Sequence, residues 1–210
     1  MRVIFGIGNP GGKYQNNRHN VGFMLLDYFA EKHLLSFIPS KGSYYSCEGN
    51  LSGNDFILVK PTTYVNNSGL AALEISEKYS LNTEDFLVLH DDINLENSML
   101  KVKISGSDGG HNGLSSLIYN FASDKFPRLR IGIGKSFKKG EMAAYVLSDF
   151  SNEESTELKK SFETGIFLIE EFISGGIKNL LDTNSKIYKS IKKIDTLKEN
   201  SSTNEKNEWW

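Results

Sequence analysis

Two residue types that carry out hydrolysis follow short apolar runs of this chain. His19 lies in a polar loop after the first run, and Asp91 follows the run Phe86–Leu89. Histidine titrates near neutral pH, so a positioned imidazole can take a proton from water. A carboxylate can fix the tautomer of that ring and stabilise the imidazolium that forms. The pair therefore indicates general-base cleavage of a labile bond such as an ester.

Three asparagines, Asn9, Asn66 and Asn112, also stand at the ends of predicted elements. Carboxamides donate and accept hydrogen bonds without titrating, so they can hold a carbonyl group and orient water. An amide aimed at a developing oxyanion is worth ~3 kcal/mol. Taken singly, an asparagine beside glycine is usually a turn residue and a loop histidine is usually a surface residue. The hydrolytic interpretation depends on the combination.

Other chemistries have weaker signals. Gly6, Gly8 and Gly11 match the spacing of the dinucleotide-binding fingerprint, which leaves an oxidoreductase as a hypothesis. That fingerprint needs a helix that opens within the glycines, whereas Pro10 and the polar run 13–20 delay the helix. A nucleophilic Ser68 stays open, although it lacks the usual elbow motif. The four histidines are scattered and Cys47 is the single cysteine, so we expect no metal site.

Apolar runs bounded by glycine and proline predict the elements that would position these residues. Strands alternating with helices predict an α/β fold: one domain over residues 1–194, with a twisted, mixed, largely parallel β-sheet surrounded by helices. Residues 195–210 are polar, and we expect a disordered tail. The predicted strands are 3–7, 56–59, 86–89, 100–104 and 128–133, and the predicted helices are 21–33, 69–79, 114–121, 152–174 and 177–194.

Composition is that of an ordinary globular protein: 210 residues, 39% hydrophobic, with a net charge of −2. No apolar run is long enough for a bilayer, and the first residues lack a signal-peptide pattern, so we expect a cytoplasmic location and no membrane partner. The stretch 125–139 is locally basic, which suits phosphate binding but is also usual for a solvated surface.

Six ordered segments together resemble the bacterial-type peptidyl-tRNA hydrolases. The matching stretches are 6–11, Tyr14 with 18–22, 60–66 with 68–69, 90–92, 109–114 and 128–134, and the resemblance extends to about Ile194. It implies hydrolysis of the ester between a peptide and the 3′ ribose of tRNA, by a monomer without metal or cofactor. An RNA-binding relative that has lost turnover is the alternative.

The resemblance also implies a role for each site residue. His19 would be the catalytic base and Asp91 its partner. Asn9 and Asn66 would contact the substrate, and Asn112 would orient water or the peptide. The resemblance further places Tyr14 and His111 along the cleft and Lys103 and Arg130 on the tRNA 5′-phosphate. Two departures stand in this chain: Val65 where relatives often have methionine, and Asp108 in a loop that is often richer in glycine.

Overall fold

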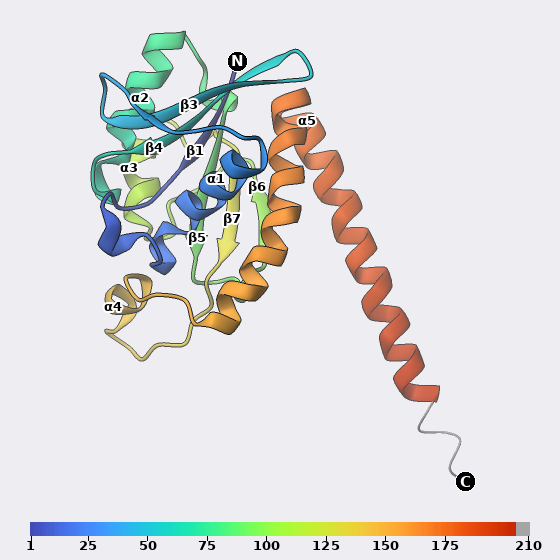
Figure 1. Ribbon diagram of the computed structural model, residues 1–210. Coiled ribbons are helices and arrows are strands. Elements are labelled where there is room, and N and C mark those ends of the chain that lie inside the picture. Colours follow the sequence, from blue (N-terminus) through green and yellow to red (C-terminus); the bar gives the residue numbers. More distant parts are fainter. Residues whose placement is uncertain (205–210) are drawn as a thin grey trace.

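The computed structural model describes residues 1–204, with side chains described up to residue 190 and at residue 193. Its centre is a seven-stranded sheet in the order β2-β3-β4-β1-β5-β7-β6 (Figure 1). The four central strands β4, β1, β5 and β7 are parallel, and β3 and β6 pair antiparallel to them, which confirms the predicted mixed α/β sheet. The strands are β1 (Arg2–Gly6), β2 (Ile38–Pro39), β3 (Tyr44–Leu51), β4 (Asn54–Pro61), β5 (Phe86–Asp92), β6 (Leu100–Lys103) and β7 (Arg128–Gly132).

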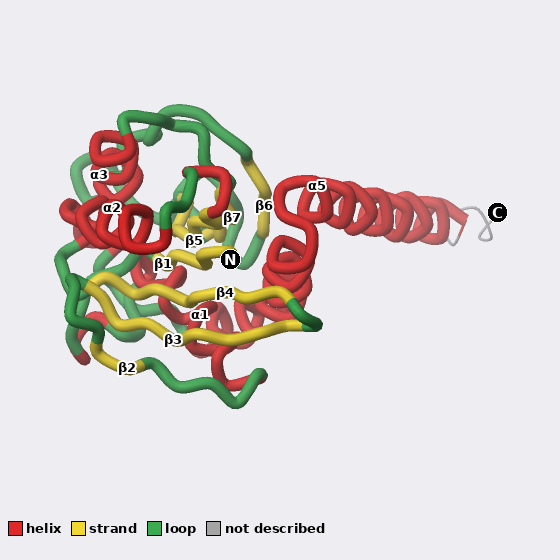
Figure 2. Tube along the Cα trace, turned by 90° about the horizontal axis from the view of Figure 1, so that it is seen from above, coloured by secondary structure: helices red, strands yellow, loops and turns green. Residues whose placement is uncertain are grey.

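Helices cover both faces of the sheet because the central strands are apolar on both sides. Alternate residues point to opposite faces of a strand. Ile4 of β1 therefore packs under α1 (Val21–Lys32) and α5 (Asn152–Asn204), while Val3 and Phe5 pack under α2 (Ser68–Tyr79) and α3 (Asn112–Phe121). Figure 2 shows α2 and α3 on one side of the sheet and α1 on the other.

Several parts of the fold differ from the sequence prediction, including the unpredicted two-residue strand β2. β3 and β4 form a hairpin that was not predicted, closed by Ser52 and Gly53, whose φ values of 50° and 86° fit a two-residue turn with both residues at positive φ. The short helix α4 (Met142–Val146) was not predicted either. The predicted helices 152–174 and 177–194 form one continuous element with a non-helical break at Gly176 (φ 62°, ψ −149°).

The prediction of a disordered tail is wrong as far as Asn204. Helix α5 continues to that residue, because neither glycine nor proline interrupts the chain after Gly176 and Leu197 extends the apolar spacing of Ile187 and Ile194. The part of that prediction on residues 205–210 lies outside the described residues. Among residues 1–204, no helix combines the length and apolar composition needed to cross a bilayer.

Helix α1 packs close against the carboxyl end of β5 through Gly22. A Cβ atom at Gly22 would overlap the carbonyl oxygen of Leu89 and would also crowd the backbone of Ile7. The absence of a side chain at this position lets the helix approach the strand closely. This contact brings the loop before α1 next to the end of β5.

Candidate active site

The polar residues predicted to carry chemistry gather at the carboxyl ends of the parallel strands. A cavity of about 510 Å³ lies there, at the usual ligand position of open α/β sheets. Eight of the nine predicted site residues line this cavity: Asn9, His19, Asn66, Asp91, Lys103, His111, Asn112 and Arg130. Their convergence is a finding, and the role of each one stays a prediction.

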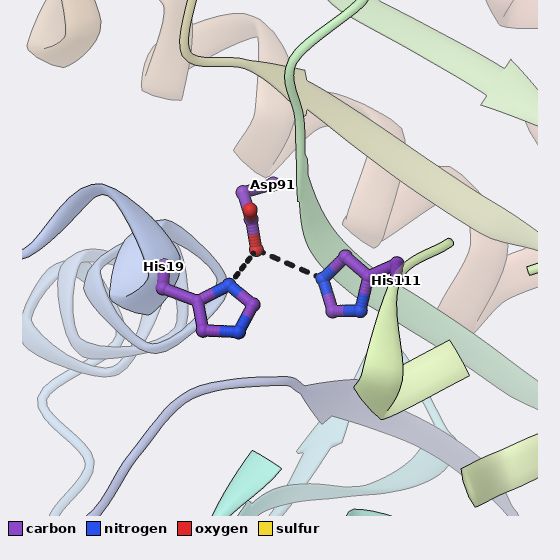
Figure 3. Close-up of side chains that lie close together, drawn as sticks. All are labelled: His19, Asp91 and His111. Atoms are coloured by element: carbon purple, nitrogen blue, oxygen red, sulfur yellow. Dashed lines mark hydrogen bonds and ion pairs between the residues drawn. The ribbon is translucent and has the colours of Figure 1, made fainter. Parts of the chain in front are cut away.

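Two histidines converge on one carboxylate oxygen. His19 comes from the short helix η2 (Arg18–Asn20), Asp91 from β5, and His111 from the residue before α3, and Figure 3 shows the three side chains pointing toward one another. The distance from His19 Nδ1 to Asp91 Oδ1 is 2.7 Å, and that from His111 Nε2 to the same oxygen is 2.9 Å. Asp91 is 4% exposed, so both bonds lie away from bulk water.

The hydrogen bonds around His111 fix its tautomer. Its Nδ1 accepts bonds from the backbone N–H groups of Gly113 (3.1 Å) and Leu114 (3.3 Å), as an N-cap of α3. Nδ1 therefore carries no proton, and Nε2–H donates to Asp91. His111 is held as a neutral donor, whereas Nε2 of His19 points away from the carboxylate and is the atom left to accept a proton.

Electrostatics support the same division of roles. Burial lowers the pKa of His19, but the charge of the Asp91 carboxylate and the bond to it raise this pKa more, so the net pKa lies above the ordinary value. Burial raises the pKa of Asp91, and the two histidines outweigh this effect, so its pKa lies well below the usual range. Asp91 therefore stays ionised while His19 exchanges protons.

Asn9 is held on three sides by buried hydrogen bonds. Its Oδ1 accepts the N–H of Val65 at 3.1 Å, which leaves the side-chain NH₂ group to donate elsewhere. Asn20 Oδ1 accepts the backbone N–H of Asn9 at 2.8 Å, and Asn20 Nδ2 donates to the Asn9 carbonyl oxygen at 2.9 Å. The sequence did not assign a role to Asn20, which is 2% exposed and sits next to His19.

Asn66 and Asn112 lie at the mouth of the cavity with exposed side chains. Asn66 belongs to the short helix η3 (Val65–Asn67), and Asn112 is the first residue of α3. Tyr14 differs from the prediction, because it is not among the cavity-lining residues. Its ring packs edge-on against Tyr64 with centroids 6.5 Å apart, which places it beside the turn that carries Asn66.

One wall of the cavity is basic. Lys103 is exposed at the end of the edge strand β6, and Arg130 lies on the neighbouring strand β7. Asp92 accepts from Arg130 Nε at 2.7 Å and lies 2.7 Å from its Nη2. Burial raises the pKa of Asp92, but the hydrogen bonds from Arg130 and the Asn94 N–H outweigh this effect. The net pKa therefore lies below the ordinary value, and this acid stays charged. The pairing fixes the guanidinium plane of Arg130.

Arg128, part of the basic stretch 125–139, is buried and does not lie on the surface as the sequence suggested. It is 1% exposed, and its guanidinium donates to the carbonyl oxygens of Ser107 (2.8 Å) and Gly106. Within the described residues its Nε has no hydrogen-bond partner, and its Cζ lies 4.5 Å from the ring centroid of Phe126. Arg128 therefore anchors the glycine-rich loop before His111, and burial lowers its pKa.

Arg18 ties the loop of His19 to the far side of the cavity. Its Nη1 and Nη2 donate to Glu154 at 2.9 and 2.6 Å, although the two residues lie far apart in sequence. Its Cζ lies 4.5 Å from the ring centroid of Tyr145, which belongs to α4. Met142 and Val146 of α4 line the cavity. Arg18, which directly precedes His19, therefore connects the loop of the proposed base to this wall of the site.

His90 is a neutral histidine of the site. It is 3% exposed, burial lowers its pKa to about 3, and its Nδ1–H donates to the carbonyl oxygen of Asp91 at 2.8 Å. It cannot serve as a base at neutral pH with that pKa. It instead supports the backbone that carries the carboxylate.

The structure also bears on the dinucleotide-binding, serine-nucleophile and metal-site alternatives. After Gly11 the chain forms only the short helix η1 (Gly12–Tyr14), and α1 begins at Val21, so no helix opens within the glycine fingerprint. Ser68 is fully buried, which removes it as a nucleophile. The four histidines are scattered in the sequence, but the fold brings three of them together, because the ring of His111 lies 5.0 Å from that of His19 and 5.2 Å from that of His90. Donor atoms of His19, Asp91 and His111 lie within 4.8 Å of one another, a set that could hold a divalent ion. In the structure Asp91 Oδ1 instead accepts a hydrogen bond from each of the two histidines.

Comparisons with known proteins agree with the fold and identify the family. The family model described as peptidyl-tRNA hydrolase matches residues 3–193. The peptidyl-tRNA hydrolase of Clostridium botulinum is 38% identical over 182 residues, which cover 87% of this chain and 94% of the relative. That of Bacillus subtilis is 37% identical over 174 residues, covering 83% and 93%. A crystal structure of peptidyl-tRNA hydrolase from Acinetobacter baumannii superimposes with a TM-score of 0.82 at 29% identity, covering 88% of this chain and 94% of that one. This chain belongs to the peptidyl-tRNA hydrolase family.

Proposed function

We propose that this protein hydrolyses the ester bond between the peptide and the 3′ ribose of peptidyl-tRNA. The observation that carries the proposal is the orientation of His19. Its Nδ1–H is bound to an ionised, buried carboxylate, and its Nε2 has no hydrogen-bond partner among the described residues and lies beside a cavity that Asn9 also lines. This is the arrangement that a general base needs to activate water.

The reaction needs only residues of this site. His19 Nε2 takes a proton from a water molecule as the water oxygen attacks the ester carbonyl. The NH₂ group of Asn9, whose oxygen is held by Val65, donates to the oxyanion that develops. The imidazolium of His19, stabilised by Asp91, then gives its proton to the 3′ oxygen of the departing ribose. The products are the free peptide and the tRNA.

The basic wall suits the RNA part of this substrate. Lys103 and Arg130 offer cationic groups at the cavity, and we propose that they bind the 5′-phosphate end of the tRNA. Phosphate contacts position a nucleic acid without reading its bases. The exposed amides Asn66 and Asn112 at the cavity mouth would hold the peptide backbone or the attacking water.

A defined peptidyl-tRNA, compared with the same tRNA carrying a free aminoacyl group, tests the proposal. We expect the blocked substrate to be cut and the free one to be largely spared. His19→Ala should lower kcat by about 10²–10⁴-fold, the usual contribution of a general base, with tRNA binding unchanged. His33→Ala is the matched control, because His33 pairs with Glu170 away from the cavity.

Two outcomes would point elsewhere. Binding of the substrate by the wild-type protein without turnover would favour an RNA-binding relative that has lost activity. Near-normal turnover by His19→Ala would show that another group is the base. The monomeric, metal-free state and the cytoplasmic location stay predictions, which sedimentation, metal analysis and cell fractionation can check.

A further inference from the structure

A row of lysines lies on the second half of α5, away from the active site. Residues 178–193 hold five lysines and one aspartate, so this segment carries a charge of +4 in a chain whose total is −2. Four of the lysines, Lys178, Lys186, Lys189 and Lys193, are described as exposed. At 3.6 residues per turn these four fall within an arc of roughly 80°, which also contains the exposed Asp182, and they extend over about 22 Å of helix.

The opposite face of this helix segment is already occupied. Leu180 is fully buried, Ile187 packs against the main hydrophobic core, and Thr183 Oγ1 lies 3.1 Å from Glu171 Oε2 of the first half of α5. The apolar side therefore anchors the segment to the protein up to Ile187. The lysine side is left for a partner, and the partner that matches a row of cations is a polyanion.

The position of this helix selects the kind of polyanion. β6 is an edge strand of the sheet, and it carries the exposed residues Lys101 and Lys103. Figures 1 and 2 both show the second half of α5 leaving the body beyond that edge. The second half of α5 therefore lies beyond the sheet edge whose strand contributes Lys103 to the cavity wall.

We propose that the lysine row of α5, namely Lys178, Lys186, Lys189 and Lys193, binds the phosphate backbone of the tRNA beyond the acceptor end. The proposal rests on the proposed function for the identity of the RNA. An anionic membrane could also attract a basic helix. The RNA is favoured because the apolar face that would enter a membrane is buried against the protein up to Ile187.

The test compares two triple variants that remove the same charge. The first is Lys186→Gln with Lys189→Gln and Lys193→Gln. The control is Lys32→Gln with Lys41→Gln and Lys78→Gln, three exposed lysines that do not line the cavity. Each protein is assayed on a full-length peptidyl-tRNA and on a short substrate in which the peptide is esterified to a CCA trinucleotide. Binding of deacylated tRNA is measured in parallel.

We expect the α5 variant to raise KM for the full-length substrate without a change in kcat, and to leave the short substrate unaffected. Loss of three phosphate contacts should also weaken the salt dependence. Between about 50 and about 200 mM salt, KM of the wild-type protein should rise roughly 40-fold more than that of the variant. The control variant should follow the wild-type protein.

Several results would overturn the proposal. One is a KM and salt dependence of the α5 variant within twofold of the control. Another is an equal loss on both substrates, which would indicate damage to the site. If the wild-type protein bound deacylated tRNA but cut neither substrate, the proposed function would fail while the binding measurement still decided the role of α5. A membrane would be the partner instead if the wild-type protein and the control variant floated with anionic vesicles, the α5 variant did not, and the α5 variant bound tRNA as well as the wild-type protein.

Discussion

Replacing Asp91 by Asn removes one charge from the site and keeps nearly the same shape. In the structure a single oxygen of Asp91 accepts from His19 at 2.7 Å and from His111 at 2.9 Å. The oxygen of an asparagine could still accept both bonds. The variant therefore separates the charge of the carboxylate from its role in holding the two rings.

The size of the effect follows from when the charge pair forms. An imidazolium and a carboxylate with charge centres about 4 Å apart attract each other by ~4 kcal/mol at an effective dielectric constant of about 20. The imidazolium exists only after His19 has taken the proton, so this attraction stabilises the transition state more than the ground state. Losing ~4 kcal/mol corresponds to a decrease in kcat of roughly 10³-fold.

The pH dependence of kcat/KM provides a second, independent test of the role of Asp91. His19 must be neutral to act as a base, so kcat/KM of the wild-type protein should rise with pH through a pKa that lies above the ordinary histidine value. In Asp91→Asn the burial that lowers the pKa of His19 is no longer opposed by a carboxylate. The acidic limb of the profile should therefore move to lower pH as the rate falls.

The assay is single-substrate kinetics on a defined peptidyl-tRNA over pH, with tRNA binding and thermal unfolding to confirm an intact fold. Asp55→Asn in the β3–β4 hairpin is the charge-matched control and should change neither kcat nor the profile, because Asp55 is exposed and does not line the cavity. A loss in kcat below tenfold, or an acidic limb that stays in place or moves to higher pH, would refute the assigned role of Asp91.

Three further variants test the supports of the site. His111→Ala should lower kcat about tenfold, less than loss of the site carboxylate, because one of the two donors remains, and loss of the cap should cost about 1 kcal/mol in thermal unfolding. Asn20→Ala should lower the free energy of unfolding in urea by about 1–3 kcal/mol and should also lower kcat, because it leaves the buried backbone N–H and C=O of Asn9 without partners. An unchanged stability would contradict the proposed role of Asn20 in holding Asn9. Arg18→Met should cost about 2–3 kcal/mol of stability, less than for a fully buried pair because the Glu154 side chain is 29% exposed, and retention of wild-type stability and rate would show that Arg18 does not support the loop.

The central part of the fold could be predicted from sequence because local patterns determine it. The apolar runs around Ile4, Leu58 and Leu87 are buried on both faces, and glycine, proline or charged residues bound them, so the strands and their order along the chain could be predicted. Asn9 and Asp91 follow such strands directly. Their convergence then follows from the shared edge of a parallel sheet.

The parts that sequence could not predict depend on contacts between distant segments. The bidentate pair of Arg18 with Glu154 joins residues with no common local pattern, and so does the clamp of Asn20 on Asn9. Helix α4 was missed because its residues are mostly exposed and its length is five residues, which leaves almost no periodicity to detect. Arg128 looked like a surface cation, since burial of a charge against backbone carbonyls leaves no signature in the sequence.

The contact between Gly22 and Leu89 has a consequence for how the enzyme tolerates change. Gly22 lies three residues after His19, and Leu89 lies two residues before Asp91. A single added methyl group at Gly22 would wedge α1 away from β5 and lengthen the hydrogen bond between imidazole and carboxylate, although it would touch neither side chain. Reacting groups must be held to within about 0.5 Å. The distance between the His19 imidazole and the Asp91 carboxylate thus depends on the absence of a side chain at Gly22, a residue outside the site.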